Sequence, residues 1–285
     1  MGNSRQTTLV LGGTGRTGSL VARKLAERGM SARTASRHSA DVRFDWDDTA
    51  THGPALAGVD RIYLVTPVMR VAYAGLVSDF LDLAEASGVR HVTYLSAYGS
   101  DHAPPGVDIS AVELELMSWR AFTFSVLRPA WLMQNFTDEH LPVVQDMVTV
   151  PTAEGAEAFV DAADIAAVAV ETLVDPDGHA GAVYAPTGPE ALTVVEVADI
   201  IARVVGRPVR HNDIDSGVWI DGAITAGLVP ADYGLMLNWL TGMIASGHGS
   251  RPNDDIHRVT GLPPASFADF ARRNAHAWAL PAAHS

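Results

Sequence analysis

The chain has 285 residues, a formal net charge of −13, 47% hydrophobic residues and no cysteine. This length and hydrophobic content allow one large domain, or a domain with an appended lobe, built on a sizeable core. The lack of cysteine excludes disulfides and thiolate metal sites and favours a reducing compartment. The acidic balance argues against a nucleic-acid partner, because phosphate backbones are bound by basic surfaces. A phosphorylated cofactor is still allowed, because it needs only a local basic patch.

The first residues are polar and lead directly into an apolar segment, so we expect no signal peptide. The longest apolar stretches, such as residues 165–170, are too short to span a bilayer. We therefore expect a cytoplasmic protein with no membrane partner, present as a monomer or a homodimer.

Apolar, β-rich runs alternate with helical patterns from the first residues to Arg128. The expected strands are residues 8–11, 32–35, 42–44, 61–65, 91–96 and 123–127. The expected helices between them are residues 16–28, 71–86 and 110–119. This alternation predicts a parallel sheet covered on both faces, which binds its ligands at the carboxyl ends of the strands.

After Arg128, prolines and glycines separate shorter elements, and helices are expected at residues 161–174, 193–205, 231–245 and 266–278. The predicted fold is α/β, a Rossmann-type doubly wound parallel sheet with a smaller C-terminal substrate lobe. Residues 1–150 are expected to form the NAD(P)-binding core. Residues 151–285 are expected to complete the sheet and add the mostly helical lobe, so that the whole chain is one structural unit.

A glycine-rich turn, Gly12-x-x-Gly15-x-x-Gly18, follows the first expected strand and opens the first expected helix. Glycine lets a backbone turn sharply and approach a pyrophosphate, and a helix N-terminus offers free N–H groups to its charge. This context predicts a nucleotide site, and a purely structural turn is the alternative. The residues assigned to the cofactor here are Gly12, Gly13, Thr14, Gly15, Arg16, Thr17 and Gly18.

The residues after the second expected strand indicate which nucleotide is bound. An NAD site usually has an acid about 20 residues past the loop to hold the ribose hydroxyls. Residues 30–40 contain no acid, and they place Ser36 and Arg37 where that acid would stand. Arg37 suits a 2′-phosphate, as does Arg16 in the loop, so NADP(H) is favoured over NAD(H). A solvated Arg37 is the alternative.

Two further segments are expected beside the cofactor. Asp45 follows the third strand, where its carboxylate suits the adenine amino group, and Trp46 suits packing nearby. The acids after Trp46 have no second oxygen cluster with ligand spacing, so no metal site is expected. Val65, Thr66 and Pro67 follow the fourth strand and are expected beside the nicotinamide ribose.

The fifth strand ends in Ser96, with Tyr98 two residues later, and here the chain resembles the short-chain dehydrogenase/reductase superfamily. That resemblance implies a Ser, Tyr and Lys set in which the lysine lowers the pKa of the tyrosine. The only lysine here is Lys24, inside the first helix, so a Tyr-x-x-x-Lys pair is excluded. Ser96 is assigned to the cofactor, and Tyr98 and His102 are the candidate proton donors. The alternatives are a structural tyrosine and a surface histidine.

Residues 124–136, FSVLRPAWLMQNF, resemble the Leu-Arg-Pro…Asn-Phe signature of NmrA-like atypical members of that superfamily. The stretches LGGTGRTGS, VRFDWDD, YLVTP, VTYLSA, FVDAADIA, GPEALT and SFADFARRNAHAW resemble the festuclavine/agroclavine dehydrogenase branch. The resemblance implies a Rossmann-fold, NADPH-dependent reductase of C=N or activated C=C bonds. It places Pro129 at the nicotinamide and Trp131 at the substrate.

The remaining candidates lie in the second half of the chain. Asn135 is assigned to the substrate, with a structural role as the alternative. Tyr233 and Trp239 belong to an aromatic and methionine-rich helix face. Such a face packs in a core more often than it lines a pocket, but if it lines the lobe, the substrate is apolar.

Three functions stay open at this stage. The leading one is an NADPH-dependent oxidoreductase of secondary metabolism that passes hydride to a small apolar imine, iminium, enone or quinone. Hydride transfer to an iminium needs no proton in that step and depends mainly on proximity and orientation. The second is a regulator that senses NADP(H) without turnover. The third is an isomerase, lyase or cyclase that retains the cofactor without net redox.

Overall fold

The computed structural model describes residues 6–137 and 141–279. The chain divides into two compact units, each made of separate segments. Of the described residues, the first unit, here called the sheet unit, contains 6–129, 162–186 and 255–262. The second, called the lobe unit, contains 130–137, 141–161, 187–254 and 263–279.

The sheet unit is built on parallel strands, seven of them in the described residues, in the order β10-β6-β5-β4-β1-β2-β3. They are β1 (Thr7–Leu11), β2 (Ser31–Ser36), β3 (Val42–Arg43), β4 (Arg61–Leu64), β5 (His91–Leu95), β6 (Thr123–Leu127) and β10 (Ala182–Tyr184). The chain starts in the middle at β1, winds outward to β3 and returns to β4 on the other side of β1. This reversal is the switch point beside which doubly wound sheets bind ligands. The predicted fold class is confirmed.

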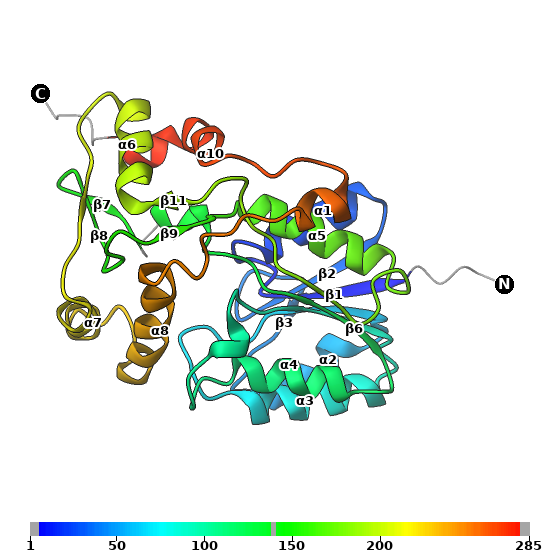
Figure 1. Ribbon diagram of the computed structural model, residues 1–285. Coiled ribbons are helices and arrows are strands. Elements are labelled where there is room, and N and C mark those ends of the chain that lie inside the picture. The colour runs from blue at the N-terminus through cyan, green and yellow to red at the C-terminus, as the bar shows by residue number, and fades with distance from the viewer. Residues whose placement is uncertain (1–5, 138–140, 280–285) are drawn as a thin grey trace, which may run out of the picture. The chain divides into compact units, whose positions relative to one another are not determined.

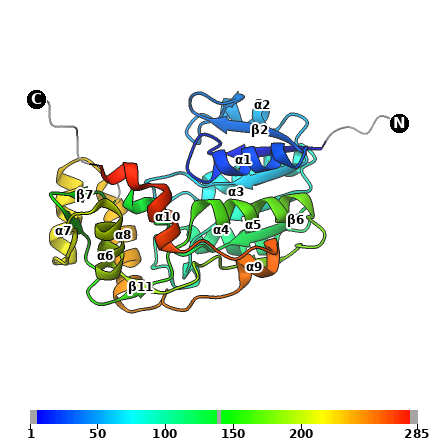
Figure 2. The same cartoon turned by 90° about the horizontal axis from the view of Figure 1, so that it is seen from above.

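Helices cover both faces of this sheet (Figure 1). On one face lie α1 (Gly18–Glu27), α5 (Ala162–Val174) and α9 (Asp255–Thr260), with α1 and α5 side by side (Figure 2). On the other lie α2 (His52–Leu56), α3 (Ala74–Ala86) and α4 (Ile109–Ser118). Because both faces are covered, β1, β4 and β5 have almost no exposed surface, although they carry a few polar residues such as His91 and Thr93. Short 3₁₀ turns are η1 (Thr49–Thr51) and η2 (Ser100–His102).

A buried polar group joins α5 to the sheet. The His91 ring lies 2.8 Å from the Thr123 hydroxyl and 3.2 Å from that of Thr93, which in turn bonds Thr172 of α5 at 2.9 Å. Burial, and then the nearby Arg61 charge, lower the pKa of His91 to about 4. His91 is therefore neutral in the folded chain at neutral pH.

The lobe unit has two small sheets and a helical cluster. Its strands are β7 (Val143–Val144), β8 (Met147–Thr149), β9 (Ala156–Glu157), β11 (Leu192–Thr193) and β12 (Arg210–Asn212). Its helices are α6 (Val194–Val205), α7 (Ser216–Thr225), α8 (Gly234–Ala245), α10 (Phe267–Arg273), η3 (Met133–Phe136), η4 (Ala231–Tyr233) and η5 (Ala275–Trp278). In its core, the rings of Phe136, Phe159 and Phe267 pack against one another edge to face. Within it, burial raises the pKa of the Glu157 carboxyl to about 7.

The structure adds to the expected elements in specific places. Helices α2, α7 and α9 were not expected, and residues 266–278 form α10 and η5 rather than one helix. Each unit is made of separate segments, because α5 and β10 return to the sheet after the chain has entered the lobe unit. Within the described residues, no helix combines the length and hydropathy needed to cross a bilayer.

His91 predicts a pH dependence of stability. Its pKa is about 4 when folded and 6.5 in the reference state, so between these values only the unfolded chain binds the proton. The contribution of His91 to the free energy of unfolding is therefore full above pH 6.5. It falls by about 1.4 kcal/mol per pH unit as the pH drops toward 4. Glu157, with its pKa raised from 4.5 to about 7, has the opposite slope.

Urea unfolding across this pH range, in wild type, His91→Gln and Glu157→Gln, separates the two effects. The difference in the free energy of unfolding between wild type and His91→Gln should shrink as the pH falls. Glu157→Gln removes the opposing contribution of Glu157, so the pH dependence due to His91 should be steeper in this variant. Identical pH slopes in all three proteins would contradict this account.

Candidate nucleotide-binding site

The glycine loop is fixed by contacts that leave no room for side chains. A Cβ on Gly13 would lie 2.7 Å from Thr34 Cβ on β2, and one on Gly18 would overlap the carbonyl oxygen of Gly12. Gly12 has a φ of +63°, a conformation that suits glycine, and its carbonyl accepts from the Gly15 N–H at 2.8 Å. The loop is therefore pressed against the sheet, where its backbone is open to a close approach by a ligand.

Helix α1 starts from this loop without a capping side chain. Thr17 at its N-cap makes no side-chain cap hydrogen bond, and the first turn contains no acid. Helix α6, by contrast, has a full capping box in which Thr193 and Glu196 bond each other's backbone N–H groups. The positive end of α1 thus keeps donors available for an anion such as a pyrophosphate.

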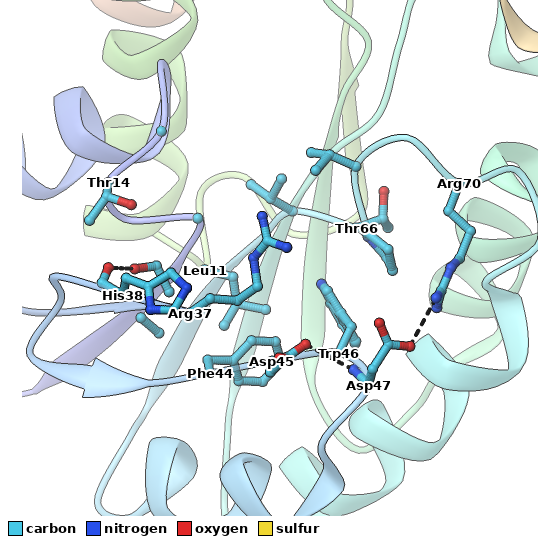
Figure 3. A pocket seen from close by; sticks show the side chains of 17 residues that line it. Leu11, Thr14, Arg37, His38, Phe44, Asp45, Trp46, Asp47, Thr66 and Arg70 are labelled. Carbon is cyan, nitrogen blue, oxygen red and sulfur yellow. Dashed lines mark hydrogen bonds and ion pairs between the residues drawn. The ribbon is translucent and has the colours of Figure 1, made fainter. Parts of the chain in front are cut away.

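A cavity of about 370 Å³ opens beside the loop at the carboxyl ends of β1, β2 and β4 (Figure 3). Its lining consists of Leu11, Gly12, Thr14, Gly15, Ala35, Ser36, Arg37, His38, Phe44, Asp45, Trp46, Asp47, Val65, Thr66, Pro67, Val68 and Arg70. All these residues belong to the sheet unit. The structure thus brings together most residues that the sequence assigned to the cofactor from Gly12 to Pro67.

One end of the cavity is basic. The exposed Arg37 extends into the cavity (Figure 3) and makes no hydrogen bond or ion pair with any described residue. Asp41, the first acid in the sequence after β2, is not among the lining residues and accepts from the Thr34 N–H and hydroxyl at 2.8 Å each. The bond from the Thr34 backbone lowers the pKa of that carboxyl. Ser36 lines the same end, with its hydroxyl donating to the His38 carbonyl.

The segment after β3 adds carboxylates and an aromatic wall to the cavity. Trp46 packs edge-on against Phe44 with ring centroids 5.0 Å apart, so its indole is held by the core while it lines the cavity. Asp45 accepts from the Asp47 N–H at 3.1 Å. Asp47 pairs with Arg70 at 2.9 Å, which ties the loop after β3 to the loop after β4 (Figure 3).

The predicted proton donors lie on the segment after β5. Tyr98 is half-buried, and its N–H donates to the Pro129 carbonyl at 2.9 Å. His102 is exposed and lies 3.9 Å from Asp101. Ser96 is buried with its hydroxyl donating to Glu113. Ser96, Tyr98, His102 and Pro129 are in the sheet unit but are not part of the described cavity lining.

Four predicted substrate residues belong to the lobe unit. The Trp131 N–H lies 3.3 Å from the Glu157 carboxylate, and Asn135 is in η3, where its carbonyl accepts from Leu141. Burial raises the pKa of Tyr233 in η4. The Trp239 indole N–H in α8 is buried with no hydrogen-bond partner among the described residues. Their assignment to a substrate stays a prediction.

Sequence reasoning missed several lining residues. His38 and Asp47 are neighbours of predicted site residues in the sequence, but their residue types and spacing are those of ordinary solvent-exposed side chains. Arg70 comes from a loop whose fold brings it to Asp47, and no spacing in the sequence indicates that pairing. The described residues contain no group of three or more His, Asp or Glu placed to hold a metal ion.

Residues 4–245 of the sequence match the model of the NmrA-like family. The chain belongs to the NmrA-like family. It is 36% identical over 280 residues to "uncharacterized oxidoreductase YesF" of Bacillus subtilis, covering 95% of this chain and 96% of that protein. It is 31% identical to an agroclavine dehydrogenase of Claviceps fusiformis and to an NAD(P)H azoreductase of Xenophilus azovorans, covering 96% of this chain and 99% of each relative. The expected resemblance and the expected class, a reductase, are confirmed.

Solved structures agree on the fold. The NADPH-dependent quinone oxidoreductase QOR2 of Escherichia coli, complexed with NADPH, superposes with a TM-score of 0.74 at 20% identity, covering 94% of this chain and 99% of that one. NmrA, a negative transcriptional regulator in complex with NAD, superposes with a TM-score of 0.73 at 15% identity, covering 94% and 95%. At these identities the likeness concerns the fold alone.

Gly18→Ala tests the loop. The added methyl would overlap the Gly12 carbonyl, so the start of α1 must shift, and we expect about 1–3 kcal/mol of destabilisation. We also expect about a tenfold or greater loss of dinucleotide affinity, because each N–H group of the cradle moves with the helix. The control is Gly75→Ala in α3, where nothing lies within 4 Å of the added carbon. Unchanged affinity in a folded Gly18→Ala protein, measured by fluorescence titration, would contradict the assignment.

Proposed function

We propose that this protein is a reductase that uses NADPH in preference to NADH and acts on small, apolar, electron-poor organic molecules. The observation that carries the cofactor preference is Arg37, a guanidinium without a described partner at the edge of the cavity. The first acid after β2, Asp41, is engaged by Thr34 and is not among the lining residues. A 2′-phosphate therefore meets a cation at this end, and a ribose diol has no acid to bind.

The chain's residues fit a dinucleotide along the length of the cavity. The backbone from Gly12 to Gly18 and the open N-terminus of α1 suit the pyrophosphate, and a Cβ at Gly13 or Gly18 would collide with Thr34 or the Gly12 carbonyl and distort this loop. Asp45 and Trp46 suit the adenine, and Thr66 and Pro67, which follow β4, line the same cavity. Bound there, a reduced nicotinamide supplies a hydride.

The residues then have three tasks: to orient the partners, to exclude water and to supply a proton where one is needed. The chain has no lysine to activate Tyr98, because Lys24 lies in α1. A tyrosine without that activation is a weak acid at neutral pH. Iminium ions, which need no proton in the hydride step, and quinones, whose oxyanion needs only an ordinary hydrogen-bond donor, therefore suit this site best, and Tyr98 serves as that donor.

The relatives support this substrate class. Their names refer to agroclavine and festuclavine chemistry and to azo compounds, and a structural neighbour is named for quinones. The lobe unit adds an apolar surface, since Val218 and Leu228 are 64% and 62% exposed and α8 is apolar around most of its circumference. We therefore assign substrate selection to the lobe unit, with Trp131, Tyr233 and Trp239 as the residues to examine first.

Arg37→Glu tests the cofactor preference. Replacing the cation by an anion at the 2′-phosphate position should weaken NADPH binding by about 100-fold or more while changing NADH binding by less than about threefold. Arg43→Glu, on β3 and outside the cavity lining, is the matched control. Isothermal titration with both cofactors provides the measurement. An unchanged ratio of the two affinities would remove the proposed role of Arg37.

Turnover separates a reductase from a regulator. We expect NADPH oxidation, with equimolar reduced product, for at least one member of a panel of iminium ions, quinones and azo compounds. Tyr98→Phe should slow iminium substrates less than quinones, because only the quinone develops an oxyanion that needs a donor. Equal, tight binding of NADP⁺ and NADPH without oxidation of any panel member would instead indicate a redox sensor. Product formed without NADPH consumption would indicate an isomerase.

A further inference from the structure

The segment that carries Tyr98 is held at both ends by one carboxylate. Ser96 and Ser100 flank Tyr98 on this segment, and the hydroxyls of both serines donate to Oε1 of Glu113, the second at 2.6 Å. Glu113 belongs to α4 and is only 2% exposed. A buried carboxylate needs its lone pairs satisfied, so these bonds strongly favour one arrangement of the segment.

The same carboxylate is tied to the end of β6. Arg128 donates to Glu113 through Nε, 3.0 Å from Oε2, and through Nη2, 2.5 Å from Oε2. Arg128 precedes Pro129, whose carbonyl accepts the Tyr98 N–H at 2.9 Å. Glu113 therefore fixes the segment of residues 96–100 and also the backbone to which Tyr98 is bonded.

We propose that Glu113 is a positioning residue that sets the place of the Tyr98 hydroxyl. Glu113 touches neither substrate nor cofactor in this account and acts only through Tyr98. The catalytic consequence rests on the proposed function, in which Tyr98 donates a hydrogen bond to the substrate. The effect on the segment itself does not, because it concerns the protein without any ligand.

The backbone conformation explains why the segment of residues 96–100 needs the bonds to Glu113. Gly99, directly after Tyr98, has a φ of +75° and permits a sharp turn into η2. A glycine at this point leaves the unfastened segment many conformations. Two serine hydroxyls on one buried oxygen, together with Arg128 on the other, restrict Tyr98 to one of them. An error of about 1 Å in a donor's place costs about 100-fold in rate.

The first test is hydrogen–deuterium exchange on the ligand-free protein. Glu113→Gln should speed exchange of the peptide that contains residues 96–102 by about tenfold or more, because an amide cannot serve as acceptor to both serines and Arg128. Glu115→Gln, two residues along the same helix, is the matched control and should leave that peptide unchanged. Equal exchange in the two variants would overturn the proposal while leaving the proposed function untouched.

The second test is a double-mutant cycle in the reductase assay with a quinone substrate. Glu113→Gln should lower kcat by about tenfold or more while the KM for NADPH stays within about twofold. In a Tyr98→Phe background the same substitution should have almost no further effect, because the hydroxyl that it positions is gone. Glu113→Asp, which keeps the charge with a shorter reach, should restore part of the rate.

The outcomes of the cycle are distinct. A loss of rate that persists at full size in the Tyr98→Phe background would overturn the proposal, since Glu113 would then act by another route. Thermal unfolding of each variant identifies any general loss of structure. A Glu113 variant with slowed turnover but unchanged exchange at residues 96–102 would also overturn the proposal. Faster exchange combined with a non-additive loss of kcat supports it.

Discussion

The close packing of a glycine backbone against the sheet is the constraint on which the rest of the site depends. Gly13 lies against Thr34 of β2, and Gly18 lies against the Gly12 carbonyl, so the loop of residues 12–17 is tightly packed and α1 begins close to the end of β1. A helix placed there directs its uncapped N–H groups and its positive dipole at the switch point of the sheet. The cavity, its basic end and its aromatic wall are all arranged around this fixed point.

Local charge, rather than the net charge, determines what the site binds. The chain carries a formal charge of −13, yet Arg37 faces the cavity without a described partner, and the acid that follows it is turned onto Thr34. The hydrogen bonds between Asp41 and Thr34 therefore affect which ligand is expected. If the Asp41 carboxylate were not bonded to Thr34, it would compete with a phosphate for the Arg37 guanidinium. In the segment after β3, the Asp47–Arg70 pair neutralises one acid and leaves Asp45 for a neutral donor group.

The sequence predicted the parts that depend on local pattern. The strand at residues 123–127 was predicted with the bounds that β6 has, and the glycine loop stood out because turn, dipole and packing all demand glycine. Helix α7 was missed because its sequence, SGVWIDGAIT, is apolar without a helical period. Arg70 and Glu113 were missed as partners because their roles arise from contacts across loops, to Asp47 and to Ser96, that only the fold brings together. The return of α5 and β10 to the sheet likewise depends on long-range packing.

A crystal structure of the complex with NADP⁺ tests the central claim most directly. The account predicts the pyrophosphate over the N–H groups between Gly12 and Gly18, the 2′-phosphate on the Arg37 guanidinium and the adenine against Trp46. A nucleotide bound elsewhere, or bound here with its 2′-phosphate away from Arg37, would contradict it.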